Sequence, residues 1–157
     1  MPTIHLTTFI AAPVERVFNL SRSLKMHKAS MTKFNEELVS GPMNDLVELG
    51  DEITWKAKHL FKNRVLKVKI VAINKFESFI DEQVMGDFKM MKHEHHFKPI
   101  ENGVFMIDFF HFESPYGNMG KWFNQAYLSG YMSKLLSQRN ELIKKYAESD
   151  QWRLILS

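Results

Sequence analysis

The chain has 157 residues, of which 45% are hydrophobic and 25% charged, and it contains no cysteine. This length and composition are typical of one globular domain with a single core. Its net charge of +3 includes no block of five like charges, so nothing indicates nucleic-acid binding, and the lack of cysteine excludes disulfides and thiolate chemistry.

The first third of the chain predicts one strand followed by two short helices. Residues 3–11 are rich in β-branched and aromatic side chains and predict a strand. Pro13 suits the first turn of a helix over residues 13–20, and Ser23 can cap a second helix over residues 24–31. Residues 34–49 hold turn signals without a periodic pattern, so we predict no element there.

The middle of the chain predicts a series of strands with short connections. Apolar and charged residues alternate, and Trp55 and His59 face one side of their strand while Lys56 and Lys58 face the other. Short connections require antiparallel neighbours. The predicted strands cover residues 52–61, 64–74, 79–85, 89–99 and 104–114.

One long helix is predicted over residues 119–147, because apolar residues recur there at spacings of three and four. Its apolar stripe also contains Arg139, which we expect either to snorkel or to pair with an inward acid such as Asp81 or Asp108. The tail, residues 149–157, would pack on the body or on a partner. Together these elements predict an α+β fold in which a curved antiparallel sheet wraps around the C-terminal helix and leaves a cavity between them.

The strands at 89–99 and 104–114 predict a hairpin with two different faces. Met91, His93, His95 and Phe97 alternate with charged residues and should point toward the long helix. A turn at residues 99–102 would pair Lys98 with Gly103, which sets His95 opposite Met106 and His93 opposite Asp108. A slip of one residue would instead bring Ile107 and Phe109 inside.

In the predicted register, Phe105, Ile107 and Phe109 form an apolar row on the outer face of the sheet. Such a row suggests a homodimer contact, or else a wrong register. The N-terminus lacks the pattern of a signal peptide, and no run of about 18 apolar residues occurs. We therefore expect a cytoplasmic protein without a transmembrane segment.

Four interpretations of the inward histidines remain open. An Asp beside a histidine can fix its tautomer, so His93, His95 and Asp108 could orient the polar end of an apolar ligand. The same cluster could instead be mutually satisfied and serve only the fold. A metal could lie on both imidazoles with Asp108 or His59 as third ligand, although no fourth is evident. Finally, His93 and Asp108 could act as an acid–base pair.

The order of elements and a set of short motifs resemble the START-like, or helix-grip (SRPBCC), superfamily. Within it, the chain is similar to small bacterial ligand-binding proteins of the polyketide cyclase/dehydrase type. The resemblance extends to about Tyr146, and departs from that branch at Leu60-Phe61, where Phe-Gly would be usual. It rests on residues 13–18 (PVERVF), 50–55 (GDEITW), 79–81 leading to 86–88, 93–97 (HEHHF), Asp108 and 115–117 (PYG).

The resemblance implies a cavity that takes lipids, sterols, polyketides or plant hormones, and either binding or cyclase activity. We expect binding or carriage of a small apolar lipid- or polyketide-like molecule in residues 1–157 as one domain, with no cofactor and no metal. The alternative is a cyclase or dehydratase that uses His93 and Asp108. The predicted ligand-binding residues are Trp55, His59, Phe88, His93, His95, Phe97, Met106, Asp108, Phe110, Phe123, Tyr127 and Tyr131.

Overall fold

The computed structural model describes residues 3–59, 62–114 and 125–156 of the chain. One strand leads into two short helices, further strands follow, and a long helix comes near the C-terminus, as the sequence predicts. The elements are β1 (Thr3–Ile10), α1 (Val14–Ser21), α2 (Leu24–Ser30), the 3-10 helix η1 (Thr32–Phe34), β2 (Glu37–Ser40), β3 (Glu52–His59), β4 (Lys62–Asn74), β5 (Ser78–Met85), β6 (Met90–Ile100), β7 (Gly103–Glu113), α3 (Gln125–Ala147), the 3-10 helix η2 (Asp150–Trp152) and α4 (Arg153–Leu156).

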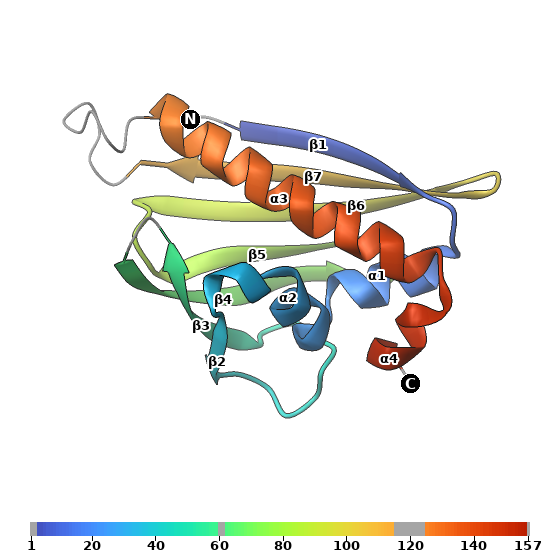
Figure 1. The fold of residues 1–157 in the computed structure, drawn as a ribbon, viewed down its shortest axis with the longest axis horizontal. Helices are drawn as coiled ribbons and strands as arrows, with labels where there is room; N and C mark the ends of the chain where they lie inside the picture. The colour runs from blue at the N-terminus through green and yellow to red at the C-terminus, as the bar shows by residue number, and fades with distance from the viewer. Residues whose placement is uncertain (1–2, 60–61, 115–124, 157) are drawn as a thin grey trace.

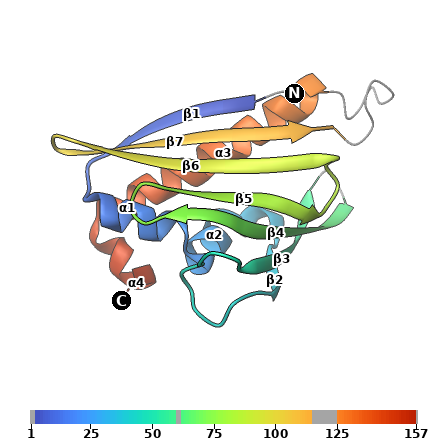
Figure 2. The same cartoon turned by 180° about the vertical axis from the view of Figure 1, so that it is seen from behind.

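The seven strands of the described residues belong to one antiparallel sheet in the order β1-β7-β6-β5-β4-β3-β2. Helix α3 runs across one face of this sheet, with α1 and α2 beside it (Figure 1). Figure 2 shows the opposite face, which no helix of the described residues covers. The predicted α+β helix-grip architecture is therefore confirmed.

Four short elements were not predicted: β2, the 3-10 helices η1 and η2, and α4. The four residues of β2 are all exposed and carry no alternating pattern. The long helix was predicted to begin at residue 119, whereas α3 is described from Gln125 onward and residues 115–124 lie outside the described part. The predicted strand end at residues 60 and 61 also lies outside it.

The β6–β7 hairpin corrects the predicted register by two residues. Ile100 pairs with Gly103, and Asn102 takes a left-handed backbone with φ of 67° in a turn much shorter than predicted. Pro99 is tolerated in the ladder because the β5 pairing ends at His96, so its missing N–H faces no neighbouring strand there. His95, not His93, consequently lies opposite Asp108.

An even shift keeps every side chain on its predicted face. Met91, His93, His95 and Phe97 are buried beneath α3, and Asp108 is 0% exposed. Phe105, Ile107 and Phe109 lie on the outer face, where the ring of His5 stacks on Phe109 at 4.6 Å. The homodimer contact inferred from that row stays a prediction.

The C-terminal tail packs on the body of the protein. Trp152, Ile155 and Leu156 contact a buried aromatic cluster around Phe18. The guanidinium of Arg16 lies 4.4 Å from the centre of the Trp152 ring, which adds a cation–π contact. No helix among the described residues is long and apolar enough to cross a lipid bilayer.

Candidate functional site

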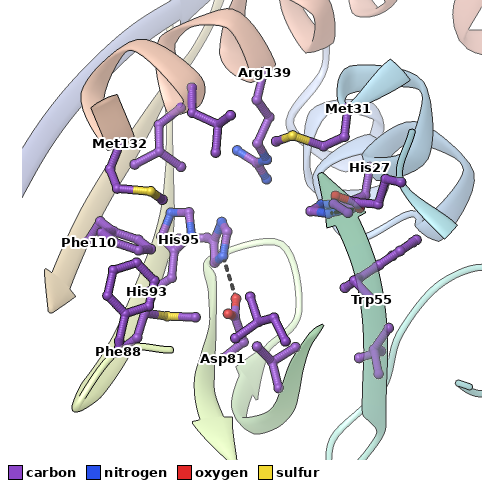
Figure 3. A pocket seen from close by; sticks show the side chains of 18 of the residues that line it. His27, Met31, Trp55, Asp81, Phe88, His93, His95, Phe110, Met132 and Arg139 are labelled. Carbon is purple, nitrogen blue, oxygen red and sulfur yellow. Dashed lines mark hydrogen bonds and ion pairs between the residues drawn. The ribbon is translucent and has the colours of Figure 1, made fainter. Parts of the chain in front are cut away.

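A pocket of about 250 Å³ lies between the covered face of the sheet and α3 (Figure 3). Alternation along the strands supplies one wall, because every second side chain of β3, β4, β6 and β7 points toward the helix. The i, i+4 spacing of α3 supplies the opposite wall. The apolar lining includes Ile53, Trp55, Val68, Ile70, Met91, Phe110, Leu128, Met132 and Leu136.

Polar side chains gather at one side of this pocket, and we call them the polar cluster: Asp81, His93, His95, Asp108, Arg139 and Asn140. His93 and His95 come from β6, Asp81 from the neighbouring β5, and Arg139 from α3. These four line the pocket, and Figure 3 shows the two imidazoles between Arg139 and Asp81. The pocket is therefore apolar on most sides and polar on one.

Asp108 does not line the pocket, but it contacts His93, Asn140 and Arg139 of the polar cluster. Its Oδ1 lies 2.8 Å from Nε2 of His93, and its Oδ2 accepts a hydrogen bond from Nδ2 of Asn140 at 2.7 Å. The nearest guanidinium nitrogen of Arg139 lies 3.7 Å from Oδ1. Burial alone would raise the pKa of Asp108, but the bond from His93 and the charge of Arg139 outweigh it and hold that pKa well below its usual range. Asp108 is thus an anion that fixes the His93 proton on Nε2.

Arg139 has the partners that a buried cation requires. Its Nη1 donates to the side-chain oxygen of Asn140 at 2.8 Å, and its Nη2 donates to the hydroxyl of Ser21 at 2.9 Å. The residue is 5% exposed, so the interpretation as an inward ion pair, rather than a snorkelling side chain, is correct. Arg139 joins α3 to α1 while balancing the charge of Asp108.

His95 is enclosed between two rings. It stacks on Phe79 at 4.0 Å and on His93 at 3.7 Å between ring centres. Its Nε2 lies 2.8 Å from Oδ2 of Asp81, whereas its Nδ1 is buried without a hydrogen-bond partner. Burial lowers the pKa of His95 far below its usual value and raises the pKa of Asp81. The imidazole is therefore neutral at neutral pH.

A second set of polar contacts borders the pocket away from the polar cluster. The Nδ1 atom of His59 lies 2.8 Å from the hydroxyl of Tyr131, which joins β3 to α3. His27 of α2 stacks on Trp55 at 4.5 Å, and its Nε2 lies 2.5 Å from a carboxylate oxygen of Glu36. Burial lowers the pKa of His59. The pocket thus offers polar atoms at two separate places.

Most predicted ligand-binding residues line the pocket, and four of the described ones do not. Phe97 packs instead on Phe18 and Phe79 in the aromatic cluster, with ring centres 5.2 Å from Phe18, and Met106 is buried in that cluster at 0% exposure. Asp108 lies behind the histidines. Tyr127 is 51% exposed on α3. Phe123 lies outside the described residues. The residues that line the pocket are Trp55, His59, Phe88, His93, His95, Phe110 and Tyr131.

The predicted stripe of the long helix is correct in part. Tyr131, Leu135 and Arg139 of that stripe line the pocket, whereas Tyr127, which we also placed in it, is exposed. Leu128, Met132 and Leu136 line the pocket as well, although they lie outside the predicted stripe. Asn140 was missed because a polar residue on a helix gives no sign that it is buried.

A metal ion could be held at one place in the cluster. Asp81, His93 and His95 each offer a ligand atom, and these atoms all lie within 4.8 Å of one another. Asp81, rather than Asp108 or His59, therefore stands as the third residue beside the two imidazoles.

Known structures with the same arrangement of elements are numerous, although their sequences differ widely from this one. A major latex-like protein from Panax ginseng is 15% identical with a TM-score of 0.68, covering 94% of this chain and 98% of that one. The KanY protein is 13% identical with a TM-score of 0.72, covering 95% and 100%. The di-domain aromatase/cyclase StfQ of the steffimycin pathway is 12% identical with a TM-score of 0.69, covering 93% of this chain and 50% of that one.

These likenesses show a START-like helix-grip fold, as the sequence motifs predicted. No protein-family model and no curated protein sequence matches the chain. The fold is therefore established by structure.

Proposed function

We propose that the chain binds and carries a small apolar molecule in the pocket between the sheet and α3. The observation that carries this proposal is the pocket itself, in which apolar walls end on a fixed set of polar groups. Small-molecule sites commonly combine apolar surface with a few well-placed polar atoms. The latex-like and cyclase neighbours share the fold, which supports a ligand-binding use without naming a ligand.

The size of the pocket limits the ligand. Its volume of about 250 Å³ lies just below the roughly 300–1,000 Å³ of typical drug-sized sites. A compact ring or short polyketide-like chain fits such a volume better than a long acyl chain. Burial of about 300 Å² of apolar ligand surface at roughly 25 cal/mol/Å² gives on the order of 7 kcal/mol before ordering costs. That amount supports micromolar binding without any covalent chemistry.

Orientation would come from the two polar places. His93, His95 and Asp81 line the pocket at the polar cluster, while His59 of β3 and Tyr131 of α3 line it at a separate place. A molecule with one oxygen at each end of an apolar body matches this arrangement. In this proposal the protein is a cytoplasmic binder of such a molecule.

Binding can be tested with the dye 1-anilinonaphthalene-8-sulfonate and with tryptophan emission, because Trp55, one of the three tryptophans, lines the pocket. Ala57→Leu fills the pocket from β3, so it should weaken dye binding at least tenfold. Lys56→Leu adds the same side chain to the exposed face of the same strand and should leave binding unchanged. Native mass spectrometry of the purified protein then identifies any co-purifying molecule. Equal dye affinity in both variants would exclude the pocket as the site.

A second candidate function is favoured by one contact. His93 lines the pocket and its Nε2 lies 2.8 Å from Oδ1 of the anionic Asp108, which is the pairing that a general base requires. In a cyclase or dehydratase, His93 would take a proton from the substrate through Nδ1 while Asp108 stabilised the imidazolium. Turnover of a polyketide-like substrate that His93→Gln abolishes, with dye binding kept, would favour this enzyme over a carrier.

A further inference from the structure

We propose that Asp81, His93 and His95 bind one divalent transition-metal ion at the polar side of the pocket. The proposal does not depend on the apolar ligand, because the metal would be held by the chain alone. Two imidazoles and one carboxylate form a ligand set that suits Zn²⁺ and its first-row neighbours.

The three ligands converge because of the sheet register. Asp81 lies directly opposite His93 in the β5–β6 ladder, and His95 follows two residues later on the same face. Their ligand atoms lie within 4.8 Å of one another. Adjacent rigid strands therefore bring the donors close together before any ion arrives, so the ordering cost of binding is small.

The surroundings of the histidines match the outer shell of a metal site. Metal-bound histidines usually donate their second N–H to a carboxylate or carbonyl, which fixes the tautomer. Asp108 accepts a hydrogen bond from Nε2–H of His93 at 2.8 Å and another from Asn140 at 2.7 Å. That arrangement leaves Nδ1 of His93 as the nitrogen available to an ion.

A bound metal ion would also explain why Nδ1 of His95 has no hydrogen-bond partner. Its Nδ1 is buried without a hydrogen-bond partner and lies 3.6 Å from Oδ1 of Asp108. If Nε2 of His95 bound a metal beside Asp81, the ring proton would be on Nδ1 and would point to the carboxylate of Asp108. Asp108 would then stand behind both histidines, and a small shift would satisfy a buried atom that otherwise has no partner.

The charges leave room for a cation. Arg139 lies 3.7 Å from Asp108 and balances it, whereas the ion pairs of the described residues give Asp81 only the imidazole of His95. The side chain of Asp81 is 16% exposed and lines the pocket. An ion placed there would keep open positions toward the pocket for water or for an oxygen of a bound molecule.

Titration with Zn²⁺ by calorimetry, and with Co²⁺ followed by visible absorption, tests the site in full-length protein freed of any histidine tag. We expect one equivalent of metal to bind. Asp81→Asn and His95→Gln should each weaken binding at least tenfold. His96→Gln is the matched control, because His96 is on the outer face of the same strand and should not affect binding.

Thermal unfolding of each variant separates lost ligands from lost fold. Asp81→Asn keeps the shape and an acceptor for His95, so it decides the matter alone if His95→Gln does not fold. Absence of stoichiometric binding, or a loss in His96→Gln equal to that in Asp81→Asn, would overturn the proposal. Dye binding measured in the same samples reports on the apolar ligand separately, so failure of one proposal is distinguishable from failure of the other.

Discussion

The two faces of strand β6 carry the same residue types in very different settings. On the inner face, His93 and His95 pair with Asp108 and Asp81 at 2.8 Å, and the His95 side chain is 5% exposed. On the outer face, Glu94 pairs with His96 at 3.2 Å and with His111 at 2.6 Å, and the His96 side chain is 39% exposed. Sequence composition alone could not distinguish these two histidine–carboxylate groups.

Burial, and not residue type, separates their electrostatics. On the inner face, burial lowers the pKa of His95 and raises the pKa of Asp81. On the outer face, slight burial would raise the pKa of Glu94, but hydrogen bonds from His111 and His96 outweigh it and lower that pKa. The inner pairs should therefore control stability and ligand chemistry, while the outer pairs remain solvated surface contacts.

Asp108→Asn should produce the largest loss of stability. The change removes the anion that Arg139 faces and sets an amide donor against the donor of either Asn140 or His93, since an asparagine keeps only one acceptor oxygen. Breaking one partner of a buried pair typically costs about 3–5 kcal/mol. Urea unfolding at neutral pH measures this loss. A change below about 1 kcal/mol would show that the inner face behaves like an exposed ion pair.

The same carboxylate should give the protein an acid limit. The folded-state pKa of Asp108 is depressed, so its stabilising contribution is complete above the unfolded-state pKa of about 3.9 and is lost as the pH falls below it. The difference in unfolding free energy between the wild type and Asp108→Asn should therefore be constant near neutrality and shrink in acid. Urea unfolding at a series of pH values checks the sign, and a difference that grows in acid would contradict it.

The sequence predicted the inner face through alternation and not through register. The predicted turn was wrong by two residues, but an even shift preserves the face, so His93, His95 and Asp108 still pointed inward. The third residue beside the imidazoles was harder to find. Asp81 becomes their neighbour only through the pairing of β5 with β6, which joins segments that no local pattern relates.

The fold was more predictable than the site for the same reason. Periodicity and caps are local, so they located the strands and most of α3, whereas exposed β2 carried no pattern. Which atoms meet across elements depends on packing. Ser21 and Asn140 show this, since Ser21 of α1 accepts from Arg139 and Asn140 of α3 donates to Asp108 of β7, and neither has a distinctive sequence context.

Asn140→Ala should cost less than Asp108→Asn. Its amide donates to Asp108 at 2.7 Å and accepts from Arg139 at 2.8 Å, and the residue is 2% exposed. Hydrogen bonds to charged groups contribute about 1.5–3 kcal/mol, so the loss should fall in that range. Gln138→Ala, at an exposed site on the same helix, is the matched control and should stay within about 0.5 kcal/mol. Equal effects of the two substitutions would show that the hydrogen bonds of Asn140 do not stabilise the polar cluster.

Glu94→Gln should change the free energy of unfolding least, so it is the reference for the substitutions on the inner face. It breaks two histidine–carboxylate contacts, as many as the inner face contains between His93, His95 and their nearest acids. Because Glu94 and its partners are accessible to water, the loss at neutral pH should be about 0–1 kcal/mol, and added salt should reduce it further. Urea unfolding in low and high salt measures both quantities. A salt-insensitive loss as large as that of Asp108→Asn would mean that the outer face is desolvated in solution, as it would be if the apolar row around Phe109 bound a second copy of the chain.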